Sequence, residues 1–164
     1  MELLYRTPIE WAQNAVKDID SFLQDHADAE RKVANMCLSL IAKYPNRTEI
    51  IDELIQISVE ELLHFKQVYN LIKYRGNQLN GVFQKDPYIK GIMSIVRSDS
   101  DEIFMDRLII ASIAELRGSE RFKLISKVVD DPKIAKFYAN LHLQELEHIE
   151  SVSYTHLRAH ETLP

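Results

Sequence analysis

The sequence predicts an all-α protein: a four-helix bundle with a long middle crossover and a short extra N-terminal helix. Two observations lead to this fold class. Glycine is scarce, with four among 164 residues, so long stretches contain few helix breakers. Within those stretches the apolar residues recur at the three-four spacing of a helix instead of alternating as in a strand. Four long helices with one long connection are typical of a bundle with a crossover.

Capping residues and breakers set the helix boundaries. The run Thr7-Pro8-Ile9-Glu10 has the capping-box pattern with proline at the first helical position, and it predicts a short helix to about residue 17. Asp20 or Ser21 can cap a second helix, which Pro45 ends.

In the second half of the chain, Gly76 stops one helix, and Asp130-Asp131-Pro132 separates the last two. These signals predict a helix over 47–75, a loop over 76–86, a short helix over 87–97, a polar turn over 98–102, and long helices over 102–128 and 132–152.

Length and composition limit the class of protein. The length fits one domain, which we expect to span residues 1–150. A net charge of −5 argues against a broadly basic nucleic-acid binder, and a single cysteine, Cys37, excludes a disulfide framework and a cysteine-based metal cluster. No apolar run approaches the roughly 18 residues that cross a bilayer, and no secretory signal is visible, so we expect a cytoplasmic protein without membrane attachment.

The apolar stripes of the long helices contain polar residues at their centres. Glu61 and His64 interrupt one stripe, and Glu145 and His148 interrupt another, each pair three residues apart on one helix face. The other two long helices carry one acid each at the equivalent place, which gives the candidate metal ligands Glu30, Glu61, His64, Glu115, Glu145 and His148.

Four carboxylates in the core need partners, because a buried charge is tolerated only when it is paired or bound to a metal. Two imidazoles cannot neutralise four acids, whereas two divalent cations can. One Glu from each of two helices and one Glu-x-x-His from each of the other two is the ligand set of di-iron and di-manganese bundles. The order Glu, then Glu-x-x-His, occurs twice along the chain at nearly the same spacing, which favours a di-metal site over surface acids and core histidines.

Glu120 competes with Glu115 as the ligand on its helix. The two lie five residues apart, roughly 140° around the helix axis, so only one can face the site. The repeated spacing and the apolar stripe favour Glu115. We expect Glu120 to pair with Arg117 or Arg121, or to support the ligands from behind.

Two further residues lie on the ligand stripes. His26 precedes Glu30 by one turn, and it is either a partly exposed helix-end histidine or a group that orients the ligand carboxylate. Tyr138 precedes Glu145 by two turns, where its ring fits the core and its hydroxyl could meet a ligand or a water.

Four segments resemble the tRNA hydroxylases of the MiaE type: DHADAERK (25–32), EELLHFKQV (60–68), IAELRGSERF (113–122) and QELEHIE (144–150). The likeness runs from about residue 4 to about residue 150. Beyond the ligands, it includes the DHA before the first Glu, the HF after the first His, and the run E-x-R-x-x-E-R-F.

Proteins of this family are ferritin-like di-iron enzymes that hydroxylate the isopentenyl group of a methylthiolated adenosine next to the anticodon. The resemblance implies a monooxygenase with two iron ions, O₂ as co-substrate, tRNA bound at its anticodon loop, and an electron-donating reductase or ferredoxin. It also implies the same six metal ligands. By ligand type alone, manganese fits as well as iron.

Five basic residues near the middle loop are candidates for contacts to tRNA phosphates, although ordinary solvated side chains explain them equally well: Lys66, Lys73, Arg75, Lys85 and Lys90. The tail SVSYTHLRAHETLP (151–164) departs from the family pattern and is similar to translated sequencing-adapter read-through. We therefore expect it to be non-native, and we assign no ligand role to His156 or His160.

Two other functions fit the same helices. A ferritin-like or rubrerythrin-like di-iron oxidase or peroxide-reducing protein would use these metals without an organic substrate, although the chain lacks the cysteine pairs of a rubredoxin-like domain. A non-catalytic helical interaction protein would keep the acids only as structural residues.

Overall fold

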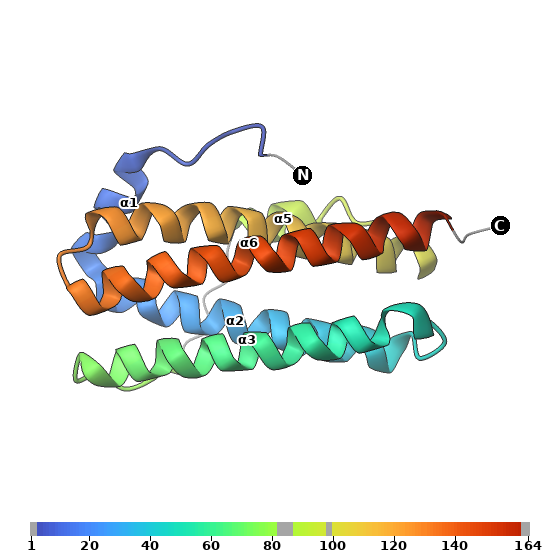
Figure 1. Cartoon of the computed structure of the whole chain (residues 1–164), viewed down its shortest axis with the longest axis horizontal. Helices are drawn as coiled ribbons and strands as arrows, with labels where there is room; N and C mark the ends of the chain where they lie inside the picture. Colours follow the sequence, from blue (N-terminus) through green and yellow to red (C-terminus); the bar gives the residue numbers. More distant parts are fainter. Residues whose placement is uncertain (1–2, 82–86, 98–99, 162–164) are drawn as a thin grey trace. The chain divides into compact units, whose positions relative to one another are not determined.

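The computed structural model describes residues 3–81, 87–97 and 100–161, and within them it leaves out the side chains of 87–89, 100–101 and 147–161. All regular structure in these ranges is helical (Figure 1). No described helix is long and apolar enough to cross a membrane. In chain order the elements are α1 (Ile9–Ala15), a 3-10 turn (Val16–Asp18), α2 (Ile19–Lys43), α3 (Thr48–Tyr74), α4 (Pro87–Met93), α5 (Ser100–Val128) and α6 (Pro132–Glu161).

These helices form two compact units. One unit, Lys17–Phe83, contains α2 and α3. The other joins Met1–Val16 to Gln84–Pro164 and contains α1, α4, α5 and α6. In each unit two long helices run side by side in opposite directions, α2 with α3 and α5 with α6, and α1 packs against α5 (Figure 1). The four long helices and the two short ones predicted from the sequence are all present.

The α2–α3 hairpin is closed by apolar packing, and it also buries one hydroxyl. Leu23 and Leu40 on α2 and Leu54 and Val68 on α3 are at most 2% exposed. Ser58 donates its hydroxyl to the carbonyl oxygen of Leu54 at 2.8 Å, so its polar group is satisfied inside its own helix. Burial of such side chains is the main stabilising term of a helical hairpin.

The predicted cap of the second helix is wrong by two or three residues. Asp18 caps α2, since its carboxylate accepts a hydrogen bond from the backbone N–H of Ser21 at 3.1 Å. The helices α1 and α2 follow one another through a 3-10 turn without a loop, so the chain enters α2 before the candidate caps Asp20 and Ser21. A polar residue close to a helix start is a cap only where the backbone leaves the helical conformation.

The predicted capping box at the start of α1 is also wrong. Pro8 is the N-cap, and no side chain caps this helix. Thr7 instead donates its backbone N–H and its hydroxyl to Glu120 Oε2, at 3.0 and 2.6 Å. The threonine is satisfied by a carboxylate far away in the sequence, which a local pattern cannot reveal.

Gly76 ends α3 as predicted. Its φ of +77° is in the left-handed region, where residues with a Cβ are disfavoured. The N–H of Asn77 donates to the carbonyl of Ile72 at 3.0 Å, and the N–H of Gly76 donates to that of Lys73 at 2.9 Å. These two bonds form a Schellman motif and satisfy carbonyl groups that the helix end leaves without partners.

The last helix starts as predicted but ends later. Asp131 caps α6, since its carboxylate accepts from the backbone N–H groups of Lys133 and Ile134 at 2.9 and 3.3 Å. The helix then continues to Glu161 instead of ending near residue 152. No glycine or proline lies between Pro132 and Pro164, so no breaker stops the helix earlier.

We expect Gly76→Ala to lower the free energy of unfolding by about 1 kcal/mol, because the new Cβ would be held at positive φ. Gly81→Ala is the matched control, since neither glycine has a heavy atom within 4 Å of an added Cβ and only Gly76 has a positive φ. Urea denaturation of both variants tests this. Equal effects of the two substitutions would contradict the assignment of Gly76 as a left-handed cap.

Candidate metal centre

The α2–α3 unit buries three of the predicted ligands. Glu30 on α2 and Glu61 and His64 on α3 are 5%, 1% and 4% exposed. The three-residue spacing of Glu61 and His64 places both on the buried side of α3. This helix therefore presents a carboxylate and an imidazole on the face that otherwise carries its apolar core residues.

Glu30 is held between two histidines. Its Oε1 atom makes a very short hydrogen bond with Nε2 of His26, one turn earlier on α2. Its Oε2 atom lies 3.8 Å from Nδ1 of His64 on α3. His26 is itself only 5% exposed, which rules out a partly exposed helix-end histidine. The carboxylate of Glu30 is fixed on one side and faces a second potential metal ligand on the other.

The α5–α6 unit brings together the next two predicted ligands. A carboxylate oxygen of Glu115 and one of Glu145 lie within 4.8 Å of each other. Glu145 is 1% exposed and Glu115 is half-buried. His148 lies one turn further along α6, and its side chain is outside the described residues. This unit therefore repeats the donor pattern of the other: one acid on the first helix and an acid followed by a histidine on the second.

The donor set fits divalent metal ions. Two carboxylates as close and as buried as Glu115 and Glu145 repel one another when both are ionised, and burial adds a large cost for each charge. A divalent cation offsets both costs, and carboxylate oxygens with imidazole nitrogens suit iron and manganese. Each unit thus contains buried carboxylates from the predicted ligand set, and a bound metal ion would stabilise their charged form.

Glu120 makes one of the two ion pairs expected for it. Its carboxylate pairs with Arg117, whose Nη1 lies 3.0 Å from Glu120 Oε2. The same Nη1 also donates to the backbone carbonyl of Tyr5 at 2.7 Å and contacts the hydroxyl of Thr7 at 3.2 Å. Burial raises the pKa of the Glu120 carboxyl, but the hydrogen bonds from Thr7 and Arg117 outweigh it, so the pKa is lowered overall.

The run E-x-R-x-x-E-R-F therefore has a structural role that sequence reasoning missed. Arg117 and Glu120 anchor the N-terminal segment, and the guanidinium of Arg121 lies 4.8 Å from the ring centre of Trp11 on α1. The run holds both the segment before α1 and α1 itself against α5, within two turns of Glu115. The close spacing of Arg117, Glu120 and Arg121 was the only feature of the sequence that could have indicated this anchor.

The core beside Glu145 contains an aromatic group and a hydroxyl–imidazole contact. Tyr138 is fully buried, and its ring centre lies 5.4 Å from that of Phe122 and 5.0 Å from that of Phe137. Ser119 Oγ lies 2.8 Å from Nδ1 of His142. Burial lowers the pKa of His142, and the charge of Lys123 lowers it further. Tyr138 therefore packs in the core of this hairpin, which is the first of the two roles expected for it.

The predicted basic residues differ in their surroundings. Arg75 pairs with Asp20, and that hydrogen bond lowers the pKa of the Asp20 carboxyl. Lys66, Lys73 and Lys90 are exposed, while Lys85 lies outside the described residues.

Comparisons with known proteins agree on one family. Residues 2–161 match the family described as tRNA-(MS[2]IO[6]A)-hydroxylase (MiaE). A tRNA 2-(methylsulfanyl)-N(6)-isopentenyladenosine(37) hydroxylase from Pseudomonas putida is 33% identical over 144 residues, which cover 88% of this chain and 69% of that protein. A protein of the same description from Salmonella typhimurium is 28% identical over 102 residues, or 62% of this chain and 37% of that protein.

A solved structure shares the fold. It is described as protein 43 with aldehyde deformylating oxygenase activity from Synechococcus. The TM-score is 0.89 at 26% identity, with 99% of this chain and 79% of that chain covered. The predicted fold class, an all-α ferritin-like bundle, is confirmed.

We expect Glu120→Gln to lower the free energy of unfolding by about 1–2 kcal/mol at pH 7, because hydrogen bonds to a charged group are lost. The folded-state pKa of Glu120 lies below its ordinary value of 4.5. This contribution is therefore complete above about pH 4.5 and is lost as the pH falls through the folded-state pKa.

Urea denaturation of wild type and variant between pH 7 and pH 3 measures this difference. Glu60→Gln is the control, since the Glu60 carboxylate accepts an exposed hydrogen bond from Gln56 on its own helix. A stability difference for Glu120→Gln that stays constant down to pH 3 would contradict the anchor.

Proposed function

Because the chain belongs to the MiaE family of tRNA hydroxylases, we propose that it is an O₂-dependent di-iron monooxygenase that hydroxylates the isopentenyl group of a hypermodified adenosine in tRNA. The family match over residues 2–161 carries this proposal. The buried carboxylates and histidines of the two hairpins support it, because they are the donor types that such chemistry needs.

We propose six metal ligands: Glu30, Glu61, His64, Glu115, Glu145 and His148. Three observations support this set. Glu30 and His64 approach one another on one hairpin, and Glu115 and Glu145 do so on the other. Glu61 is as deeply buried as Glu145, at 1% exposure. In this proposal residues 1–150 form the catalytic domain, and the tail 151–164 adds no ligand.

When bound, iron would supply activation of O₂ and transfer of one oxygen atom to an unactivated C–H bond. The chain's own residues would hold that centre in place. His26 fixes one oxygen of Glu30 and so leaves the other directed toward the His64 side. Glu115 and Glu145, with oxygens within 4.8 Å of one another, could share a cation. Burial of these groups keeps water away from them, which strengthens every electrostatic contact they make.

The fold alone does not choose the substrate. The Synechococcus protein has the same fold and is described as having aldehyde deformylating oxygenase activity. The curated relatives of this chain are instead described as tRNA hydroxylases. We therefore place the substrate in tRNA, at the base next to the anticodon. We further propose a reductase or ferredoxin as electron donor and the cytoplasm as location, where the tRNA is found.

The direct test is a hydroxylation assay. The protein is loaded with Fe(II), supplied with O₂ and a chemical or enzymatic reductant, and incubated with isopentenylated tRNA. Nucleoside mass spectrometry is expected to show the gain of one oxygen atom in the isopentenyl group. Consumption of O₂ or peroxide without modified nucleoside, in protein that holds two irons, would favour the oxidase alternative.

We expect Glu61→Gln to lose at least one of the two metal ions and the hydroxylase activity, since an amide is a weaker ligand than a carboxylate. Glu60→Gln is a closely matched control, because it is the neighbouring residue and lies off the buried face. Metal content after loading and desalting measures the effect. Equal metal content in the two variants would remove Glu61 from the ligand set.

We expect His26→Ala to weaken metal binding by about 10- to 100-fold, the usual effect of losing a group that orients a ligand. His26→Gln, which keeps a side-chain donor, should recover part of that loss. His142→Ala is the control, because His142 contacts Ser119 and no proposed ligand. If both alanine variants lowered stability equally and neither changed metal affinity, His26 would be a packing residue only.

A further inference from the structure

The chain is acidic overall, and its longest run without an acid is residues 62–85. This run contains three lysines and one arginine in a chain of net charge −5. Most of it is the second half of α3, a regular helix, so its cations have fixed positions along one element.

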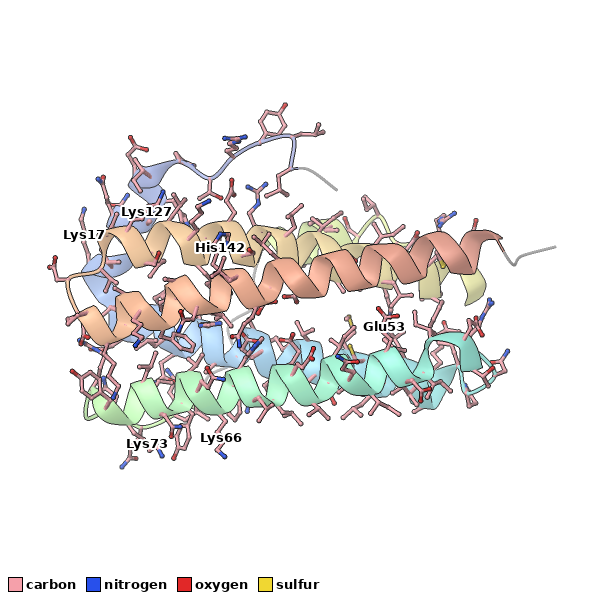
Figure 2. All side chains as sticks on the ribbon, in the orientation of Figure 1. Lys17, Glu53, Lys66, Lys73, Lys127 and His142 are labelled. Carbon is pink, nitrogen blue, oxygen red and sulfur yellow. The ribbon has the colours of Figure 1, made fainter. Side chains whose placement is uncertain are left out.

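Two of these cations share one outward face of α3. Lys66 and Lys73 are seven residues apart, which is about two helical turns. They therefore lie on nearly the same side of the helix. Both are exposed, and Figure 2 shows them on the same side of α3, pointing away from its ribbon. Among the residues that the structure describes, neither has a carboxylate within ion-pairing distance. Arg75, in contrast, is already paired with Asp20.

Aromatic rings on the same face hold one of these cations in place. The ammonium of Lys73 lies 4.7 Å from the ring centre of Tyr69. The Tyr69 ring in turn stacks on Phe65, with ring centres 6.4 Å apart and ring planes at 10°. The residues follow at intervals of four, so they form a column along the helix. A lysine restrained in this way loses less side-chain entropy when it binds an anion.

We propose that this face of α3, formed by Lys66, Tyr69 and Lys73, binds the phosphate backbone of the tRNA. The proposal rests on the proposed function and adds the docking surface to it. Exposed cations without ion pairs release counterions when they meet phosphates, which is the main source of affinity for nucleic acids. A helix half without acids of its own also adds no repulsion of the polyanion.

A second copy of the chain is the competing occupant. Toward its N-terminus the same face continues with Ile55, Val59 and Leu62, which are 46%, 53% and 48% exposed. Apolar residues of this kind favour contacts between proteins. The absence of acids over 62–85 and the contact of Lys73 with the Tyr69 ring favour RNA for the second half of the helix. The experiment measures both tRNA affinity and oligomeric state, because the two occupants change different quantities.

The test is the double reversal Lys66→Glu with Lys73→Glu in the full, metal-loaded chain. The control is Lys43→Glu with Lys136→Glu, which changes the net charge equally. Both control lysines are exposed, and Lys43 also lies over a tyrosine ring, 5.3 Å from the centre of Tyr44. Binding of an isopentenylated anticodon stem-loop is followed by fluorescence anisotropy over a range of salt concentrations, and size-exclusion chromatography follows the oligomeric state.

We expect the Lys66/Lys73 variant to bind the stem-loop at least about tenfold more weakly, with the slope of log affinity against log salt reduced by about 2. The control should stay within about twofold of wild type. KM for tRNA should rise in the first variant while kcat and metal content stay unchanged, because both lysines lie on the exposed side of α3 and Glu61 and His64 lie on its buried side.

Four results would overturn the proposal. Equal weakening by both double variants would show only a net-charge effect. A change in oligomeric state with unchanged tRNA affinity would assign the face to a second copy of the chain. Wild-type protein that holds two irons but neither binds nor modifies tRNA would overturn the proposed function as well. Normal hydroxylation by the Lys66/Lys73 variant with unchanged KM would overturn the docking surface alone.

Discussion

The constraint on which the rest of the structure depends is the placement of carboxylates in apolar helix stripes. Glu30, Glu61 and Glu145 are at most 5% exposed, at positions where a helical hairpin would otherwise carry leucine or valine. Buried carboxylates destabilise a fold unless charge of opposite sign offsets them. Two divalent cations held by these carboxylates would supply that charge, and this connects the fold to the proposed chemistry.

The residues around the carboxylates act to keep them in fixed positions. His26 fixes Glu30 through a hydrogen bond on its own helix. Near Glu115, the contacts of Arg117 and Glu120 with Tyr5 and Thr7 anchor the N-terminal segment to α5. The ligands of a metal centre need fixed side-chain positions, and hydrogen bonds to neighbouring side chains keep them in place. Arg117 and Glu120 on α5 are thereby explained as supports.

Much of this structure could be predicted from the sequence, because the relevant signals are local. The three-four spacing of apolar residues defined the long helices, Gly76 and Asp131 marked a helix end and a helix start, and the interrupted stripes singled out buried acids. The failures are equally instructive. Thr7 resembled a cap but bonds to Glu120, and Asp18 replaced Asp20 or Ser21 as the cap of α2. The first choice depends on a carboxylate far away in the sequence, and the second on a 3-10 turn that leads into α2 without a loop. A linear pattern contains neither.

The most direct test of the central claim compares the free energy of unfolding of metal-free and Fe(II)-loaded protein under anaerobic conditions at pH 7. A ligand that binds only the folded state stabilises it, by about 2.7 kcal/mol when its free concentration is 100 times its Kd. The account predicts a gain of this kind, together with metal binding that saturates at two ions per chain. No gain and no saturable binding would show that the buried carboxylates are accommodated without metal, and would contradict the di-metal centre.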